Sequence, residues 1–211
     1  NFDPSNLTHY QTPNFYLPLS TLSGTIRLRH IISANPIAGP CDPVTGEVED
    51  YTMTVPINTA PTINNLSNTS LPSIQLSNTN SLGWPLTKVT RHLEPASSII
   101  DDADDKGISF SLETARGIAI TGMNAPNGTW QYKTGTGGWA SISGVSNANA
   151  LLLIANGVST VLNTNTLLRF VPSATGTATL TIRAWDGTQG TNGNFYNIVS
   201  TGGSTAFSTG E

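Results

Sequence analysis

The sequence is poor in charge, in cysteine and in long apolar runs, and each shortage narrows the classes of protein that it can encode. Only 10% of its 211 residues are Asp, Glu, Lys or Arg, against about 25% in average globular proteins. The net charge of -4 gives no basic surface for a nucleic acid. Cys41 is the only cysteine, so no disulfide can form within the chain. No apolar run approaches the roughly 18 residues of a membrane-spanning helix, so we expect no membrane insertion.

Motifs for catalysis are missing as well. The sequence has no zinc-protease, nucleophile-elbow or phosphate-loop motif. His9, His30 and His92 are far apart in the chain and lack the spacing of metal ligands. Ser and Thr are so abundant that a catalytic triad would not stand out, but nothing marks one. We therefore predict a protein that is not an enzyme, with a hydrolase of unrecognised site as the weakest alternative.

The chain is rich in Ser, Thr and Asn, which together make about a third of it. Thr is favoured in strands, whereas Asn and Ser are favoured in turns. Short apolar-alternating runs separated by Gly, Pro and Asn are typical of an all-β protein. Its length suffices for one or two small domains. The predicted strands outside the central region are Thr25–Ser33, Glu47–Val55, Ser73–Leu76, a short segment around Trp84, Lys88–Leu93 and Phe195–Val199.

The region from Gly117 to Asp186 carries the strongest strand signals. Ile118 and Ile120 alternate with small residues, which predicts a strand half buried on one face. The motifs GIAIT, GTWQYK, GGW, ALLL, LRFVP and TLTIRAWD follow one another in this region. In identity and order they resemble the cadherin-like repeat of large bacterial surface and secreted proteins, over roughly residues 61 to 211. The resemblance implies an Ig/cadherin-like β-sandwich that acts as a spacer or binding module, is often stiffened by calcium, and is not catalytic.

The tryptophans of this region divide into two groups. Trp130 and Trp185 lie inside strongly patterned strands, so we predict that they pack in the sandwich core with Phe170. Trp139 follows a Gly-Gly turn and is predicted to be the most exposed. An exposed indole can stack on a sugar ring. Trp139 is therefore the candidate ligand-binding residue of the alternative function, an accessory glycan-binding module attached to a secreted enzyme.

A second resemblance covers about residues 1 to 57. The strand Thr25–Ser33, which contains arginine, is followed by a Pro/Cys loop and then by GEVEDY at Gly46–Tyr51. This order is similar to the end of the GEVED domain, a β-sandwich module of secreted bacterial proteins that is common in Bacteroidota. The resemblance implies that only the closing, C-terminal part of such a module is present here.

The segment Pro56–Thr62 reads as a linker, because its two prolines stiffen the chain and break strand pairing. We therefore predict three parts: 1–57 as the partial GEVED-like module, 58–200 as the cadherin-like sandwich, and 201–211 as a junction to a following module. Two strands without the rest of their module are marginally stable. They must pack on the cadherin-like sandwich, pair with a neighbouring copy or belong to a larger protein. We expect one of the last two, in a longitudinal array whose N-terminal strands are completed by chain outside these residues.

Acidic residues cluster near the second N-terminal strand. One interpretation is a cation site, and the other is a solvated strand edge whose carboxylates pair with Arg27 and Arg29. The four acids are Asp42, Glu47, Glu49 and Asp50.

The acidic run DDADD, Asp101–Asp105, is the candidate metal site. Its carboxylates repel one another unless solvent or a cation screens them, and alternate Asp residues can point two carboxylates at one Ca²⁺. From the residues alone, a calcium site and a polar turn are equal alternatives. The cadherin-like resemblance favours calcium, because Asp102–Asp104 matches the D-x-D of that family and Asp186 matches its second acidic position. The candidate ligands are Asp101, Asp102, Asp104, Asp186 and Glu94.

These patterns together predict a structural or adhesive segment of a long extracellular bacterial surface protein or filament, stiffened by calcium. The expected partners are neighbouring modules, other copies of the same protein, or a surface glycan or other target on a host cell.

Overall fold

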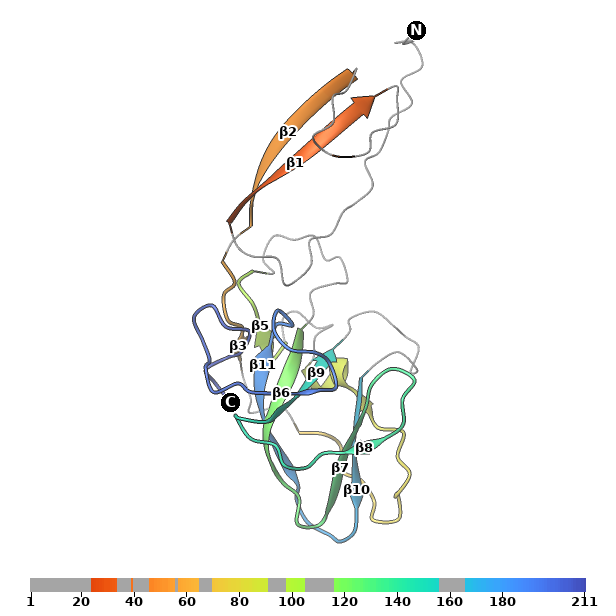
Figure 1. The fold of residues 1–211 in the computed structure, drawn as a ribbon. Coiled ribbons are helices and arrows are strands. Elements are labelled where there is room, and N and C mark those ends of the chain that lie inside the picture. The colour runs from red at the N-terminus through yellow and green to blue at the C-terminus, as the bar shows by residue number, and fades with distance from the viewer. Residues whose placement is uncertain are drawn as a thin grey trace.

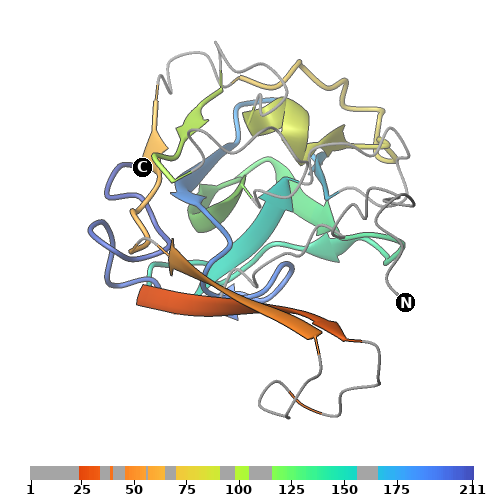
Figure 2. The same ribbon diagram turned by 90° about the horizontal axis from the view of Figure 1, so that it is seen from above.

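The architecture is all-β, as predicted: two four-stranded antiparallel sheets pack as a sandwich, and a two-stranded hairpin stands apart from it (Figure 1). The orange hairpin lies outside the sandwich in that view and again in the view from above in Figure 2. The computed structural model describes residues 24–33, 39, 46–55, 57–64, 70–90, 98–104, 116–155 and 166–211.

The first sheet of the sandwich contains the strands predicted from GTWQYK and LRFVP. Phe170 and Trp130 are partners in the ladder between these two strands. Their rings lie 5.1 Å apart between centroids and are tilted by 59°, a geometry that favours aromatic pairs. In order across the sheet, the strands are β4 (Trp84–Pro85), β10 (Leu167–Pro172), β7 (Gly128–Lys133) and β8 (Ala140–Ser141).

The second sheet has its central strands buried on both faces. Ile118 and Ile120 face the first sheet, while Ala119 belongs to a separate apolar cluster on the outer side, with Trp185 and Phe207. The prediction of a strand half buried on one face is therefore wrong here, because the C-terminal segment covers the outer face. In order across the sheet, the strands are β11 (Thr179–Trp185), β6 (Arg116–Asn124), β9 (Ala150–Ala155) and β12 (Phe195–Tyr196).

The main core lies between the two sheets and contains Trp130 and Phe170, as predicted. Trp185 is also fully buried, but it lies in the outer cluster beside Ala206 and Phe207 rather than between the sheets. The segment 206–208 reaches this position by pairing with the end of β11, where Phe207 forms a bridge with Trp185. The outer face of the second sheet thus owes its cover to residues near the C-terminus.

The hairpin confirms both predicted N-terminal strands. β1 (Gly24–Ser33) and β2 (Gly46–Val55) pair antiparallel over their whole length. The Arg29 guanidinium binds the Asp50 carboxylate through two hydrogen bonds of 2.7 and 2.8 Å, and Arg27 lies 3.6 Å from it. Asp50 therefore follows the solvated-edge interpretation. Asp42 lies outside the described residues.

Three strand predictions are wrong in whole or in part. Ser73–Leu76 forms no strand, and the predicted strand at Phe195–Val199 is reduced to β12. In place of the first residues of Lys88–Leu93, the chain forms the short helix α1 (Leu86–Thr90). Leu86 and Thr90 are both buried, and the Thr90 hydroxyl donates to the Leu86 carbonyl over 3.1 Å, so one helical face is fixed to the sandwich. Within the part of the chain that the structure describes, no helix combines the length and apolarity needed to cross a membrane.

Candidate functional site at the linker

The linker meets the sandwich between two acidic segments that are distant in sequence. At the end of the linker, β3 (Thr62–Ile63) pairs antiparallel with β5 (Ile100–Asp101), which brings the acidic run beside the linker. Figure 1 shows these two strands at the end of the sandwich nearest the hairpin. The Ala60 amide donates to the Gly203 carbonyl over 2.8 Å, and Pro61 is buried. The linker is therefore packed against the sandwich by its own backbone.

Asp186 holds the beginning of the linker. It follows β11 directly, is buried, and its Oδ1 accepts hydrogen bonds from the Thr188 amide at 2.8 Å and the Thr188 hydroxyl at 2.7 Å. Gly187, with a φ of 84°, allows the tight turn between them. The other oxygen, Oδ2, accepts from Asn58 Nδ2 at 2.9 Å, and the same nitrogen lies 3.2 Å from the Thr205 carbonyl. A buried carboxylate thus has one local partner and one partner in the linker.

The acidic run holds the next residue of the linker. Asp102 is buried, and its Oδ1 accepts from the Asp104 amide at 3.0 Å in a local Asx turn. That turn directs Asp104 towards the linker, where its Oδ2 accepts from the Thr59 amide at 2.6 Å. Asp101 is half-buried in β5. The D-x-D pattern therefore works as a pair in which one Asp shapes the loop and the other binds the linker.

Sequence reasoning found two of the acids in this arrangement but missed their partners. The structure brings Asp104 and Asp186 to adjacent linker residues, Thr59 and Asn58. The signal in the sequence was a polar residue, Asn58, two positions after Pro56. No local pattern indicates that its side-chain amide binds a carboxylate. Glu94 and Asp105 lie outside the described residues. Among the residues that the structure does describe, no three of His, Cys, Asp or Glu lie close enough to hold a metal ion.

The donor chemistry of this junction suits a hard cation. Calcium prefers about six to eight oxygen ligands, from carboxylates and from amide or backbone carbonyls. Asp102, Asp104 and Asp186 supply carboxylate oxygens, the atoms that calcium prefers as ligands. Asn58 adds an amide oxygen. The oxygen atoms are of the right kind, although the acids do not form a three-membered group among the described residues.

Trp139 is the predicted ligand-binding residue, and it is half-buried rather than freely exposed. It is less buried than Trp130 and Trp185, as expected. The Arg169 guanidinium lies 4.1 Å from the centroid of the Trp139 ring and covers one of its faces. The edge of the ring packs so closely on Gly83 that a side chain there would be 2.6 Å from it.

Arg169 is a buried cation held by uncharged groups. Its Nε donates to Gln131 Oε1 at 2.9 Å, and its Nη1 donates to the Ser81 carbonyl at 2.9 Å. Burial lowers the pKa of Arg169 below its ordinary value, because desolvation disfavours the charged form. The cation–π contact with Trp139 offsets part of that desolvation. The simplest role for Trp139 is therefore to stabilise Arg169.

Comparisons of the chain with protein-family models, with curated proteins and with solved structures give no match. The junction combines buried carboxylates with a segment that connects the hairpin to the sandwich.

Proposed function

We propose that the chain is a structural, non-catalytic segment of a long extracellular bacterial surface protein or filament, and that calcium stiffens its linker. The observation that carries this proposal is the junction, where Asp186 and Asp104 bind Asn58 and Thr59 of the linker. The order of the cadherin-like and GEVED-like motifs supports it as well. Sandwiches stacked end to end make a long protein that extends far from the cell surface, and a rigid linker keeps successive sandwiches in a fixed direction.

The electrostatics of the junction favour a cation. Asp102 and Asp186 are buried, and Asp101 and Asp104 lie close to Asp102 in sequence, so negative charge borders the linker at both acidic segments. The residues that would hold calcium are Asp102, Asp104 and Asp186, with the amide oxygen of Asn58, and the three acids would have to come closer together than they lie in this structure. Calcium bound there would neutralise the carboxylates and tie the linker to both acidic segments. The linker would then bend less than its own hydrogen bonds alone allow.

Calcium dependence of thermal unfolding tests the proposal. In excess calcium the chain should melt above its temperature in chelator, by roughly 5–10 °C when calcium exceeds its dissociation constant 100-fold. Asp186→Asn and Asp104→Asn, which keep the side-chain size, should reduce that difference. Asp50→Asn on the hairpin is the matched control and should leave it unchanged. A melting temperature indifferent to calcium and to chelator would contradict the proposal.

Glycan binding by an accessory module is the second candidate function, and it rests on Trp139. Arg169 covers one face of its ring, so at most the other face is available to a sugar. Trp139→Phe and Trp139→Ala should be compared on a panel of surface polysaccharides. Binding that is lost in Trp139→Ala, kept in Trp139→Phe and accompanied by an unchanged melting temperature would favour this function over the structural one.

A further inference from the structure

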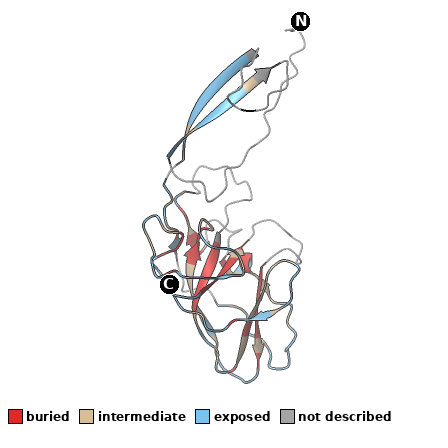
Figure 3. Ribbon diagram, viewed as in Figure 1, coloured by how far each residue is buried: buried red, intermediate tan, exposed pale blue. Residues whose placement is uncertain are grey.

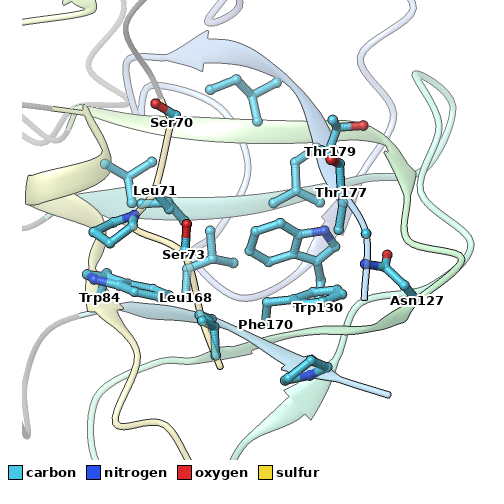
Figure 4. A pocket seen from close by; sticks show the side chains of 18 of the residues that line it. Ser70, Leu71, Ser73, Trp84, Asn127, Trp130, Leu168, Phe170, Thr177 and Thr179 are labelled. Atoms are coloured by element: carbon cyan, nitrogen blue, oxygen red, sulfur yellow. The ribbon is translucent and has the colours of Figure 1, made fainter. Parts of the chain in front are cut away.

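A cavity of about 890 Å³ opens between the two sheets, beside β10 and β11 (Figure 4). Its walls are apolar and polar in nearly equal measure, and the apolar residues among them include Leu71, Trp84, Phe170 and Leu180. Hydroxyl groups gather at its rim, among them Ser70, Ser73, Thr177 and Thr179. The volume is in the range of ligand sites in proteins, and the polar share of the lining is larger than in most such sites.

Two buried polar atoms in this cavity have no protein partner. The Trp130 indole Nε1–H has no acceptor and the Asn127 Oδ1 has no donor. Both side chains are more than nine-tenths buried, with 7% and 6% of their surface exposed. Figure 4 shows the indole nitrogen on the side of the ring that faces Thr177 and Asn127. Because buried polar groups in folded proteins are almost always hydrogen-bonded, this pair leaves one donor and one acceptor to be satisfied by a bound water or by an occupant of the cavity.

The backbone edge of β11 is open beside the same cavity. β11 pairs with β6 on one side only, and it is the outermost strand of its sheet. Near its end the outer side is covered, since the Ser208 amide donates to the Ala184 carbonyl over 3.0 Å. Between Thr179 and Ile182, no described segment pairs with the outer edge. Leu180 and Ile182 on this stretch line the cavity and are only half-buried.

We propose that this groove binds an extended strand of a separate polypeptide, which pairs with the β11 edge at Thr179–Ile182 and inserts alternate side chains between the sheets. A strand satisfies both requirements at once, because each of its residues carries a backbone donor and acceptor and every second side chain points to one face. A compact small molecule would fill the cavity but would leave the β11 edge unpaired.

The lining also specifies the chemistry of that strand. Among the described residues that line the cavity, Glu211 is the only charged one, and its carboxylate is bound by Arg183 at 2.6 Å. The inward-facing side chains of the partner strand are therefore uncharged, with apolar groups against the apolar wall and hydroxyl or amide groups near Trp130, Asn127 and the threonines. Outward-facing positions are free to be polar. The inference is independent of calcium at the linker, since none of the junction acids lines this cavity.

Amide hydrogen exchange with a designed peptide tests the proposal. The probe is a capped peptide of alternating Thr and Val, and the matched control peptide alternates Thr and Asp. The Thr/Val peptide should slow exchange of β11 edge amides between Thr179 and Ile182 at least tenfold, and the Thr/Asp peptide should not. The same probe can be fused after Glu211 through a flexible linker, which raises its effective concentration.

Two leucine variants locate the binding. Leu180→Asp places a charge in the cavity wall and should abolish the protection, while Leu82→Asp, at an exposed position outside the lining, should leave it unchanged. If Leu180→Asp does not fold, the peptide comparison on the unaltered chain still decides.

Four results would overturn the proposal. The first is no protection even from the fused probe, and the second is equal protection by the Thr/Asp peptide. The third is edge protection that appears with self-association of the chain alone, because the occupant would then be a second copy. The fourth is a small aryl alcohol that raises the melting temperature and prevents peptide binding without protecting any edge amide, because the cavity would then be a small-molecule site.

Discussion

The hairpin and the sandwich are built from similar strand-forming residues, yet they differ in what covers them (Figure 3). β1 and β2 are each ten residues long and fully paired, but Leu28 within them is 39% exposed. The strand β9 has six residues, and its Leu153 is 0% exposed. Backbone pairing alone therefore does not produce burial. A second layer does, and only the sandwich has one among the described residues.

The difference separates two contributions to stability. A paired strand satisfies its backbone groups, which contributes little net free energy because water satisfied them before folding. Removal of apolar surface from water contributes about 25 cal/mol per Å² and needs a facing layer. Leu28, Val48 and Tyr51 of the hairpin remain exposed, so their burial adds little. The predictions below test whether the two regions differ in this way.

The largest expected effect comes from truncation of the same side chain in the two regions. Leu153→Ala leaves a cavity in the core between the sheets and should lower the free energy of unfolding by about 2–5 kcal/mol. Leu28→Ala removes a side chain that is already partly in water, so its effect should stay within about 0.5 kcal/mol. Urea unfolding of both variants measures the two values. Equal effects would show that the hairpin is covered in solution.

A second comparison uses added volume in place of lost volume. In Gly128→Ala the new Cβ would lie 2.4 Å from both the Phe170 ring and the Val171 carbonyl, so β7 and β10 must move apart. We expect a loss of about 3 kcal/mol, at the upper end of typical overpacking costs. Gly138→Ala is the control, because no atom lies within 4 Å of its new Cβ. In thermal and urea unfolding, the stability of Gly138→Ala should be close to that of the parent chain. If Gly128→Ala were equally stable, β7 and β10 would be able to move apart at little cost.

The attachment of the linker should have a smaller effect. Asn58→Ala removes the amide that binds the buried Asp186 carboxylate, and hydrogen bonds to charged groups contribute about 1.5 kcal/mol or more. Asn64→Ala is the matched control, since that side chain is exposed. Asn58→Ala should lose stability and become cleavable near residues 57–61 in limited proteolysis. Unchanged cleavage and stability would indicate that the linker is held by its backbone bonds alone.

Local pattern predicted most of the fold. The motifs GIAIT, GTWQYK, ALLL, LRFVP and TLTIRAWD form strands and GGW lies between two of them, because alternation and strong turn residues act within a few positions. The failures have longer-range causes. Leu86–Thr90 forms a helix because a helical face fits against the sandwich. β6 is buried on both faces because residues 206–208 cover the outer one. Such covering depends on where distant segments pack, which no local pattern contains.

The candidate site, like the fold, was predicted only in part. The acidic run pointed to Asp104 and the cadherin-like resemblance pointed to Asp186, whereas the roles of Asn58 and Thr59 depend on how the linker folds back on the sandwich. The cavity near Trp130 was not predicted at all. Alternation correctly placed that indole in the core, but it could not show that the Nε1–H would lack an acceptor.

The smallest expected effect concerns the ion pair on the hairpin. The hydrogen bond from Arg29 holds the pKa of Asp50 below its ordinary value of 3.8, with further contributions from the charges of Arg29 and Arg27. A carboxyl group whose pKa is lower in the folded state stabilises that state at higher pH. Its contribution is present above the unfolded-state pKa and is lost as the pH falls through the folded-state pKa.

Asp50→Asn should therefore leave the global unfolding transition unchanged, since the pair is exposed and screened by solvent. Its effect should be confined to β1 and β2, where amide protection in the parent chain decreases below about pH 4 and protection in the variant stays constant across that range. Carboxyl chemical shifts and hairpin amide exchange, measured by NMR from neutral to acidic pH, provide both observations. Arg27→Gln is the control and should change little, because Arg27 lies 3.6 Å from the carboxylate while Arg29 binds it directly. An Asp50 that titrates at or above its ordinary pKa would mean that the pair is open in solution, and a variant whose sandwich also loses stability would mean that the two regions are coupled.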